Sequence, residues 1–182
     1  TWISNNAFYG CPQMKAPTFP EGLKNIGMQA FADCMNLGEV TLPSTTNVNA
    51  EAFLRSHITK LNLPDENNGI VICPRSFYGV TGLTTVKIPS WWKNLGASVF
   101  EKCQDLTSVD FSALEDGTLQ IEQYAFSNCS SLTSVQFPER IDYIGTGAFQ
   151  NTSLTEIKIP AANTLGTAAF KDTKITKVIW GE

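Results

Sequence analysis

The cysteines are the residues whose type and spacing come nearest to a metal or disulfide framework. Four of them lie three residues after a phenylalanine, namely Cys11, Cys34, Cys103 and Cys129. After other phenylalanines the same position holds Ser56, Val80, Thr152 and Thr173. A position that accepts all these side chains selects for small size, and no CxxC motif or histidine cluster accompanies it. We expect buried free thiols, with metal binding least favoured; disulfides remain the alternative, joining Cys11 to Cys34 and Cys103 to Cys129.

Residues for acid–base catalysis are few. His57 is the only histidine, between Ser56 and Ile58, and we expect an exposed turn residue rather than a general base. The adjacent pairs Asp65-Glu66 and Glu115-Asp116 lie in connecting segments, and sequence neighbours seldom face each other across a substrate. No phosphate loop, GxSxG elbow or HExxH motif occurs. We therefore predict that the chain is not an enzyme and has no catalytic residue, bound metal or cofactor.

Composition narrows the partners. The net charge of -4 comes from 17 acidic and 13 basic residues scattered singly, so nucleic acid is not an expected partner. No apolar run approaches the roughly 18 residues of a membrane span, so we expect no membrane insertion. The chain begins partway through a repeat and shows no signal peptide, which indicates a mature or truncated fragment.

One sequence motif, centred on a phenylalanine, recurs along the chain. The anchors are Phe8, Phe31, Phe53, Phe77, Phe100, Phe126, Phe149 and Phe170, with spacings of 21 to 26 residues. Downstream of most anchors lies an apolar triplet at offsets 0, +3 and +5, as in Leu37, Val40 and Leu42. The last two members alternate with polar residues, which predicts a short strand with one buried face. Prolines such as Pro43 and Pro89 then end the strand.

This triplet has the LxxLxL spacing of a leucine-rich repeat. No single repeat can bury its own phenylalanine, so the coils must stack. We therefore predict one domain over residues 1–182, an α/β leucine-rich-repeat solenoid of about eight coils. It should carry a continuous parallel sheet on its concave side. Short strands and helical turns, the latter beginning at each Ala-Phe pair, should form the convex side.

Ser56, Thr152 and Thr173 occur in repeats that have one residue fewer before the next apolar position. We hypothesise that each hydroxyl bonds a backbone group and closes a tighter turn.

The chain follows a pattern of the form IxxIGxxAFxxCxxLTxVxIP, as over residues 26–43 and 121–138. It resembles the BspA-like leucine-rich repeat of bacterial and protozoan surface proteins, and the resemblance covers essentially the whole chain. Departures occur at Pro17, in the fourth repeat around residues 65–77, in the lengthened sixth repeat and at Trp180. The resemblance implies an extracellular or cell-surface protein, often of a host-associated bacterium, that mediates adhesion.

Ligand contacts are expected on the outward side of the strands, where each coil contributes two side chains. The candidates are Glu39, Lys60, Asn62, Thr85, Lys87, Ser108, Asp110, Ser134, Gln136, Glu156 and Lys158. This polar surface suits a protein or glycan partner, and a solvated sheet is the equal alternative for any one residue. Trp92 aligns with core residues, whereas Trp91 should be exposed, with loop packing favoured over a ligand contact.

We therefore predict a noncatalytic interaction or adhesion module, monomeric unless its exposed ends associate. An intracellular scaffold would use the same face. A glycan-processing enzyme is a weaker alternative, because Glu39, Asp110 and Glu156 are separated by several coils.

Overall fold

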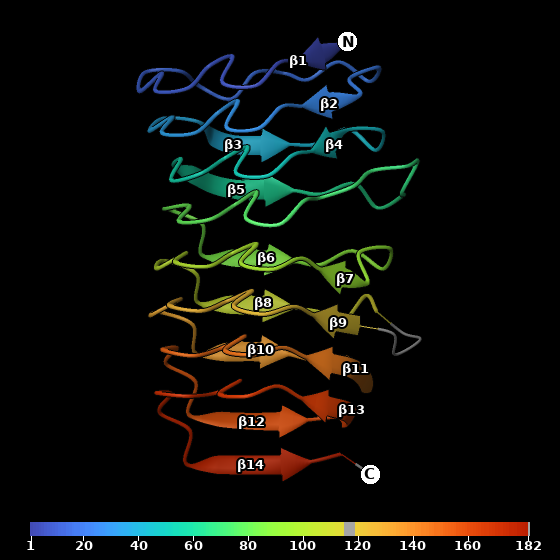
Figure 1. The fold of residues 1–182 in the computed structure, drawn as a ribbon, viewed down its shortest axis with the longest axis vertical. Coiled ribbons are helices and arrows are strands. Elements are labelled where there is room, and N and C mark those ends of the chain that lie inside the picture. Colours follow the sequence, from blue (N-terminus) through green and yellow to red (C-terminus); the bar gives the residue numbers. More distant parts are fainter. Residues whose placement is uncertain (115–118, 182) are drawn as a thin grey trace.

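A computed structural model describes residues 1–114 and 119–181, and shows a stack of coils in which two rows of strands run along the rod (Figure 1). We call the first row the outbound strands: β3 (Gly38–Thr41), β5 (Ile58–Asn62), β6 (Thr85–Lys87), β8 (Ser108–Asp110), β10 (Ser134–Gln136), β12 (Glu156–Ile159) and β14 (Lys177–Trp180). The second row is the return strands: β1 (Trp2–Ile3), β2 (Asn25–Ile26), β4 (Asn47–Val48), β7 (Asn94–Leu95), β9 (Leu119–Ile121), β11 (Arg140–Ile144) and β13 (Ala161–Leu165).

All strand pairs are parallel, but each row is divided. The outbound strands pair as β3-β5, β6-β8-β10 and β12-β14, and the return strands as β1-β2-β4 and β7-β9-β11-β13. The predicted continuous sheet is therefore interrupted between β5 and β6 and between β10 and β12. Two of the sequence departures are irregular in the structure: the segment around Pro17 is not a strand, and Ile72 forms only an isolated bridge to Val48.

The core is a column of the anchoring phenylalanines. Successive rings from Phe8 to Phe170 are stacked, with centroids 5.2 to 5.6 Å apart. The inner residues of the apolar triplets close the core from the strand side, as Val40, Val86 and Val109 do. Each coil therefore covers the apolar face of its neighbour, and this burial of apolar surface stabilises a repeat fold.

The predicted helical turns were wrong: the described residues contain no helix, and therefore none that could span a membrane. Residues two before and two after each anchor have positive φ, as Glu51 (58°) and Arg55 (52°) do on either side of Phe53. A left-handed residue ends an α-helical run after one turn.

Hydrogen bonding along these turns alternates between the coil itself and its neighbour. Leu54 N–H donates within its own turn to the Glu51 carbonyl at 3.0 Å, whereas Phe53 N–H donates to the Ser76 carbonyl of the next coil at 2.9 Å. Half of the amide groups thus join neighbouring coils, and a helix would keep them all within one coil.

The position three residues after the anchor carries two hydrogen-bonding patterns. The hydroxyls of Ser56, Thr152 and Thr173 donate to the carbonyl of their own coil's phenylalanine at 2.8 to 2.9 Å, so the hypothesised bond is present. Thiols at this position donate instead to the phenylalanine carbonyl of the preceding coil at 3.1 to 3.2 Å, as in Cys34, Cys103 and Cys129.

Replacing Thr152 with Val should lower the free energy of unfolding by about 1 kcal/mol, because the buried Thr152 hydroxyl is the donor to the Phe149 carbonyl and Val keeps the shape. Thr155→Val, at an exposed position of the same coil, is the matched control and should change stability by only a few tenths of a kcal/mol. Urea denaturation of both variants measures the difference. Equal losses would show that the hydroxyl bond contributes nothing.

Candidate functional site

The outward side chains of the outbound strands form two columns, as predicted. Strand register aligns Glu39 with Lys60 and Thr85 with Ser108 in the first column. In the second column it aligns Lys87 with Asp110 and Asp110 with Gln136. Every candidate is exposed or half-exposed, including Asn62, Ser134, Glu156 and Lys158. The columns are broken where strand pairing is broken, so the face consists of three patches rather than one stripe.

Charges on this face are partly paired with one another. Glu39 accepts hydrogen bonds from Asn62 at 2.7 Å and from Lys60 at 3.0 Å, and these bonds lower the pKa of the Glu39 carboxyl. Lys177 donates to Glu156 at 2.9 Å in the same way. In the middle patch the Asp110 carboxylate accepts from its neighbour Ser112 N–H at 2.8 Å. Lys87, by contrast, makes no ion pair with any residue of the described chain.

The surface around Lys87 is shallow. Two hollows of about 300 Å³ flank it, one against Asn62 and Ser90 and the other against Ser108 and Gln136. The three carboxylates of the face lie on β3, β8 and β12, with other strands between them. Paired acid and base chemistry uses two carboxylates within about 10 Å of each other, and no two of these three lie on paired strands.

The remaining candidates from the sequence are the residues considered for acid–base chemistry. His57 is half-buried rather than exposed, because its ring packs on Gly82 and its Nδ1 lies 3.1 Å from the Thr81 hydroxyl. Asp65 and Glu66 are exposed, and Glu115 and Asp116 lie outside the described residues.

The tryptophans also differ in part from expectation. Trp92 is buried, as predicted. Trp91 is half-buried instead of exposed, since it packs against the core and its Nε1–H donates to the Pro64 carbonyl at 2.8 Å.

The cysteines behave as small core residues. Cys34, Cys103 and Cys129 are buried, Cys11 is half-buried, and all five cysteines are free. Burial raises the pKa of the Cys103 thiol to about 12 and that of the Cys129 thiol well above its ordinary value. Such thiols stay protonated and unreactive at neutral pH.

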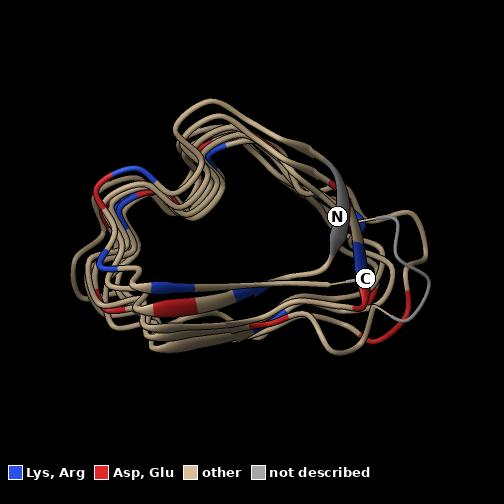
Figure 2. Cartoon of the chain, turned by 90° about the horizontal axis from the view of Figure 1, so that it is seen from below, with Lys and Arg blue, Asp and Glu red and all other residues tan. Residues whose placement is uncertain are grey.

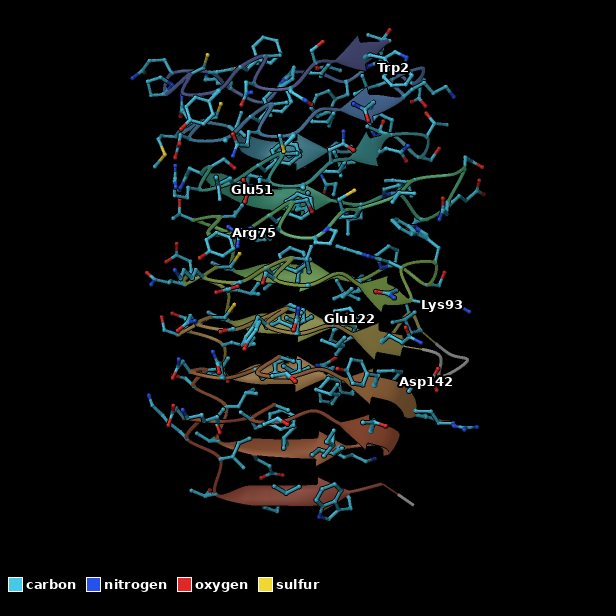
Figure 3. The ribbon with its side chains drawn as sticks, in the orientation of Figure 1. Trp2, Glu51, Arg75, Lys93, Glu122 and Asp142 are labelled. Carbon is cyan, nitrogen blue, oxygen red and sulfur yellow. The ribbon has the colours of Figure 1, made fainter. Side chains whose placement is uncertain are left out.

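A charged ladder along the turn side was not predicted from the sequence. Arg75 donates to Glu51 at 2.8 Å, and Figure 3 labels both side chains. Glu51 also accepts a hydrogen bond from Gln29 at 2.6 Å. Arg55 binds Asp33 through two bonds of 2.8 and 2.6 Å. All five residues lie two residues from an anchor, at left-handed positions, and that spacing was the signal available in the sequence. Figure 2 shows charged residues at this edge of the coils and on the outbound strands.

The Arg55–Asp33 pair predicts a pH dependence of stability. Hydrogen bonds from Arg55 lower the folded-state pKa of the Asp33 carboxyl, so this contribution is present above pH 4 and is lost as pH falls through the lowered value. Asp33→Asn should lower the free energy of unfolding by about 0.2–1 kcal/mol at pH 6, and by less at pH 3.

A double-mutant cycle with Arg55→Met isolates the pair, because Arg55 is the largest cause of the lowered Asp33 pKa and the pH-dependent part of the Asp33→Asn effect should shrink without it, leaving the smaller contribution of Tyr9. Urea denaturation at pH 3 and pH 6 measures it. An undiminished pH dependence in the Arg55→Met background would assign the effect to another group.

The repeated coils, the parallel rows of strands and the buried phenylalanine column define the chain as a leucine-rich-repeat solenoid. Within that class it belongs to the family described as "BspA type Leucine rich repeat region", which matches in six copies over residues 1–113 and 46–177.

Solved structures share the fold. A leucine-rich repeat protein from Bacteroides ovatus is 22% identical with a TM-score of 0.79, over 99% of this chain and 53% of its own. The T. pallidum leucine-rich repeat protein is 25% identical with a TM-score of 0.66, over 82% of this chain and 69% of its own. The chain thus spans about half the length of the Bacteroides ovatus protein. Comparison with curated proteins gives no match.

Proposed function

We propose that this chain is a noncatalytic interaction module of a secreted or cell-surface protein, and that it binds a protein or glycan partner through its outbound strands. The observation that carries the proposal is the polar surface around Lys87, exposed on a sheet whose inner residues Val86 and Val109 are buried. Repeat proteins commonly present such extended faces to partners.

The middle patch, formed by β6, β8 and β10, supports direct binding best. Its three strands are paired in register, so outward side chains are held at strand spacing. Lys87 and Gln136 project there as exposed polar groups. Hydrogen bonds to such groups are formed without ordering a loop first, which favours affinity.

Location is proposed on the family resemblance alone. BspA-like modules occur in surface proteins, and adhesion to host or matrix proteins follows by analogy. An intracellular scaffold would use the same face, and a signal peptide or lipidation site encoded upstream would discriminate against it.

The proposal is tested by screening the chain against extracellular-matrix proteins and a glycan array. A variant carrying Lys60→Ala, Lys87→Ala and Asp110→Ala is screened in parallel. Lys102→Ala, Lys171→Ala and Asp172→Ala form the matched control, because they remove the same charges from the exposed turn side. Light scattering before the screen excludes end-to-end association of copies through Trp2 and Trp180, which are exposed at opposite ends.

We expect a partner that is lost in the outbound variant and retained by the turn-side control. Binding that survives the outbound variant would move the site away from this face. The absence of any partner would favour a spacer role.

A further inference from the structure

One boundary between neighbouring coils has no strand pairing in either row of strands. It lies between β5 and β6, and we call it the seam: residues 60–73 against residues 84–96 (Figure 1). At the other coil boundaries of the described chain at least one row is paired; beside the gap between β10 and β12, for example, β11 pairs with β13. Across the seam β5 is not paired with β6, and no backbone hydrogen bond of the described residues joins residues 70–73 to β7.

The turn side of the same coils is closed. Phe53 N–H donates to the Ser76 carbonyl at 2.9 Å, and Phe77 N–H donates to the Val99 carbonyl at 3.1 Å. The Phe77 ring also stacks on Phe53 and Phe100, with centroids 5.5 and 5.4 Å away, as in the rest of the column. The coils on the two sides of the seam are therefore tied along their turns and not along their strands.

The glycines four residues before an anchor show how closely the coils approach on the strand side. An added Cβ at Gly27, Gly145 or Gly166 would lie 2.4 to 2.6 Å from a backbone atom of the preceding coil. At Gly96 the nearest atom, the Pro74 nitrogen, would be 3.3 Å away. The N–H groups of the first three glycines donate to the preceding coil at 2.6 to 2.9 Å, whereas no such bond from Gly96 is found among the described residues. The backbones thus stand further apart at the seam.

A side chain bridges the seam where the backbone does not. Trp91 Nε1–H donates to the Pro64 carbonyl at 2.8 Å, and we call this bond the strap. The Trp91 ring stacks on the buried Trp92, with centroids 6.1 Å apart. Beside them a groove of about 650 Å³ opens on the return side, and Val71 lines it with 55% of its surface exposed. One neutral hydrogen bond gains little against competing water, so the strap closes the seam without locking it.

We propose that the seam is a hinge. The coils before it and the coils after it rotate about the intact turn side, and the strap holds the strand side closed. Opening occurs where the fewest backbone hydrogen bonds must break, and both rows of strands are already interrupted here. The rotation tilts the outward face of β3 and β5 against that of β6, β8 and β10. The hinge is a property of the free chain and does not depend on the proposed function.

The closed arrangement remains the major state, because apolar side chains of the seam are buried in it. Ile70, Ile72 and Trp92 are among them, and their exposure to water opposes opening. The open arrangement is therefore a minor population, which a change at the strap shifts.

The test measures distances between spin labels by double electron–electron resonance on the full chain. Cys11→Ser and Cys73→Ser remove the two half-buried thiols, and the other three cysteines are buried. Three pairs of exposed positions, each spanning two coils, are then replaced with labelled cysteines. They are Val71 with Gln120 across the strand side of the seam, Arg55 with Lys102 across its turn side, and Gln120 with Thr164 within the paired strands β9, β11 and β13.

We expect the Val71–Gln120 distances to be broad, with a minor component at longer distance, and the other two pairs to be narrow. Trp91→Phe keeps a ring and loses the strap, so it should raise the minor component about fivefold. Thr152→Val is the matched control, because it also deletes one buried hydrogen bond, in a coil away from the seam. It should leave the minor component unchanged. Circular dichroism confirms that each variant is folded.

The hinge is excluded if the Val71–Gln120 distances are as narrow as the Gln120–Thr164 distances. Equal broadening of the Arg55–Lys102 pair would overturn rotation about the turn side. A minor component that Trp91→Phe leaves unchanged, or that Thr152→Val raises as much, would show that the bond to Pro64 is not a strap.

Discussion

Phe126→Ala should lower the free energy of unfolding by about 3–5 kcal/mol, the range for deleting a fully buried aromatic side chain. The Phe126 ring is buried and stacks between Phe100 and Phe149, with centroids 5.6 and 5.2 Å away. Phe111 also meets it edge-on at 6.2 Å. Alanine would leave a cavity bounded by three rings from the two neighbouring coils.

The measurement is urea denaturation followed by circular dichroism, with Phe170→Ala as the matched control. Phe170 occupies the same position in the last coil, is half-buried and has one stacking neighbour, Phe149, at 5.4 Å. We expect its removal to lower stability by half as much or less. Because coils contact only their neighbours, Phe126→Ala should also split the transition into two steps. Equal losses at the two positions would show that the column does not act as a shared core.

Gly145→Ala should lower the free energy of unfolding by about 1–3 kcal/mol through overpacking. A Cβ at this position would lie 2.6 Å from the Gln123 nitrogen and from the Glu122 carbonyl carbon, both of them backbone atoms of the preceding coil. Backbone atoms cannot rotate away, and the 2.7 Å bond from Gly145 N–H to the Ile121 carbonyl would lengthen as the coils separate.

Gly22→Ala is the control for Gly145→Ala, since an added Cβ at Gly22 meets no atom within 4 Å. It should leave stability unchanged or raise it by about 0.4–1 kcal/mol through the unfolded chain. Thermal unfolding of the two variants compares them directly. A neutral Gly145→Ala would mean that the coils can separate locally without loss, in contrast to the close stacking of the structure.

The fold was predictable because the same sequence motif occurs in successive coils. The anchor spacing predicted the coils and the buried column from Phe31 to Phe149, and the alternation around Val40 and Val86 predicted which side of each strand faces outward. One prediction was wrong in the same way in every coil, because the turns that begin at the Ala-Phe pairs are not helical. Two residues after the anchor, six of the eight positions hold Gly, Asn or Asp, which tolerate positive φ and were a signal against a helix. Two residues before the anchor, side chains such as Glu51 and Tyr124 also hold positive φ, and their types do not indicate that conformation.

The candidate site was predictable only in part. The outward residues of β6, β8 and β10 lie where alternation placed them. Their division into patches was not predicted, and neither was the half-burial of Trp91. Both depend on how two particular coils meet, which sequence spacing within each coil does not specify.

By itself the sequence determined the number of coils, the stacking core and the polar character of the outward face, because these follow from periodicity and from the need to cover each coil's apolar side. The tertiary structure alone decided where the ladder of hydrogen bonds is interrupted. Between β5 and β6 the ladder is absent. There the segment from Pro64 to Cys73 lies next to Trp91 and Trp92 with no backbone hydrogen bond between them. Residues that are about 20 positions apart in the sequence, such as Val71 and Trp91, line the groove there, so the groove forms only when the two coils stack.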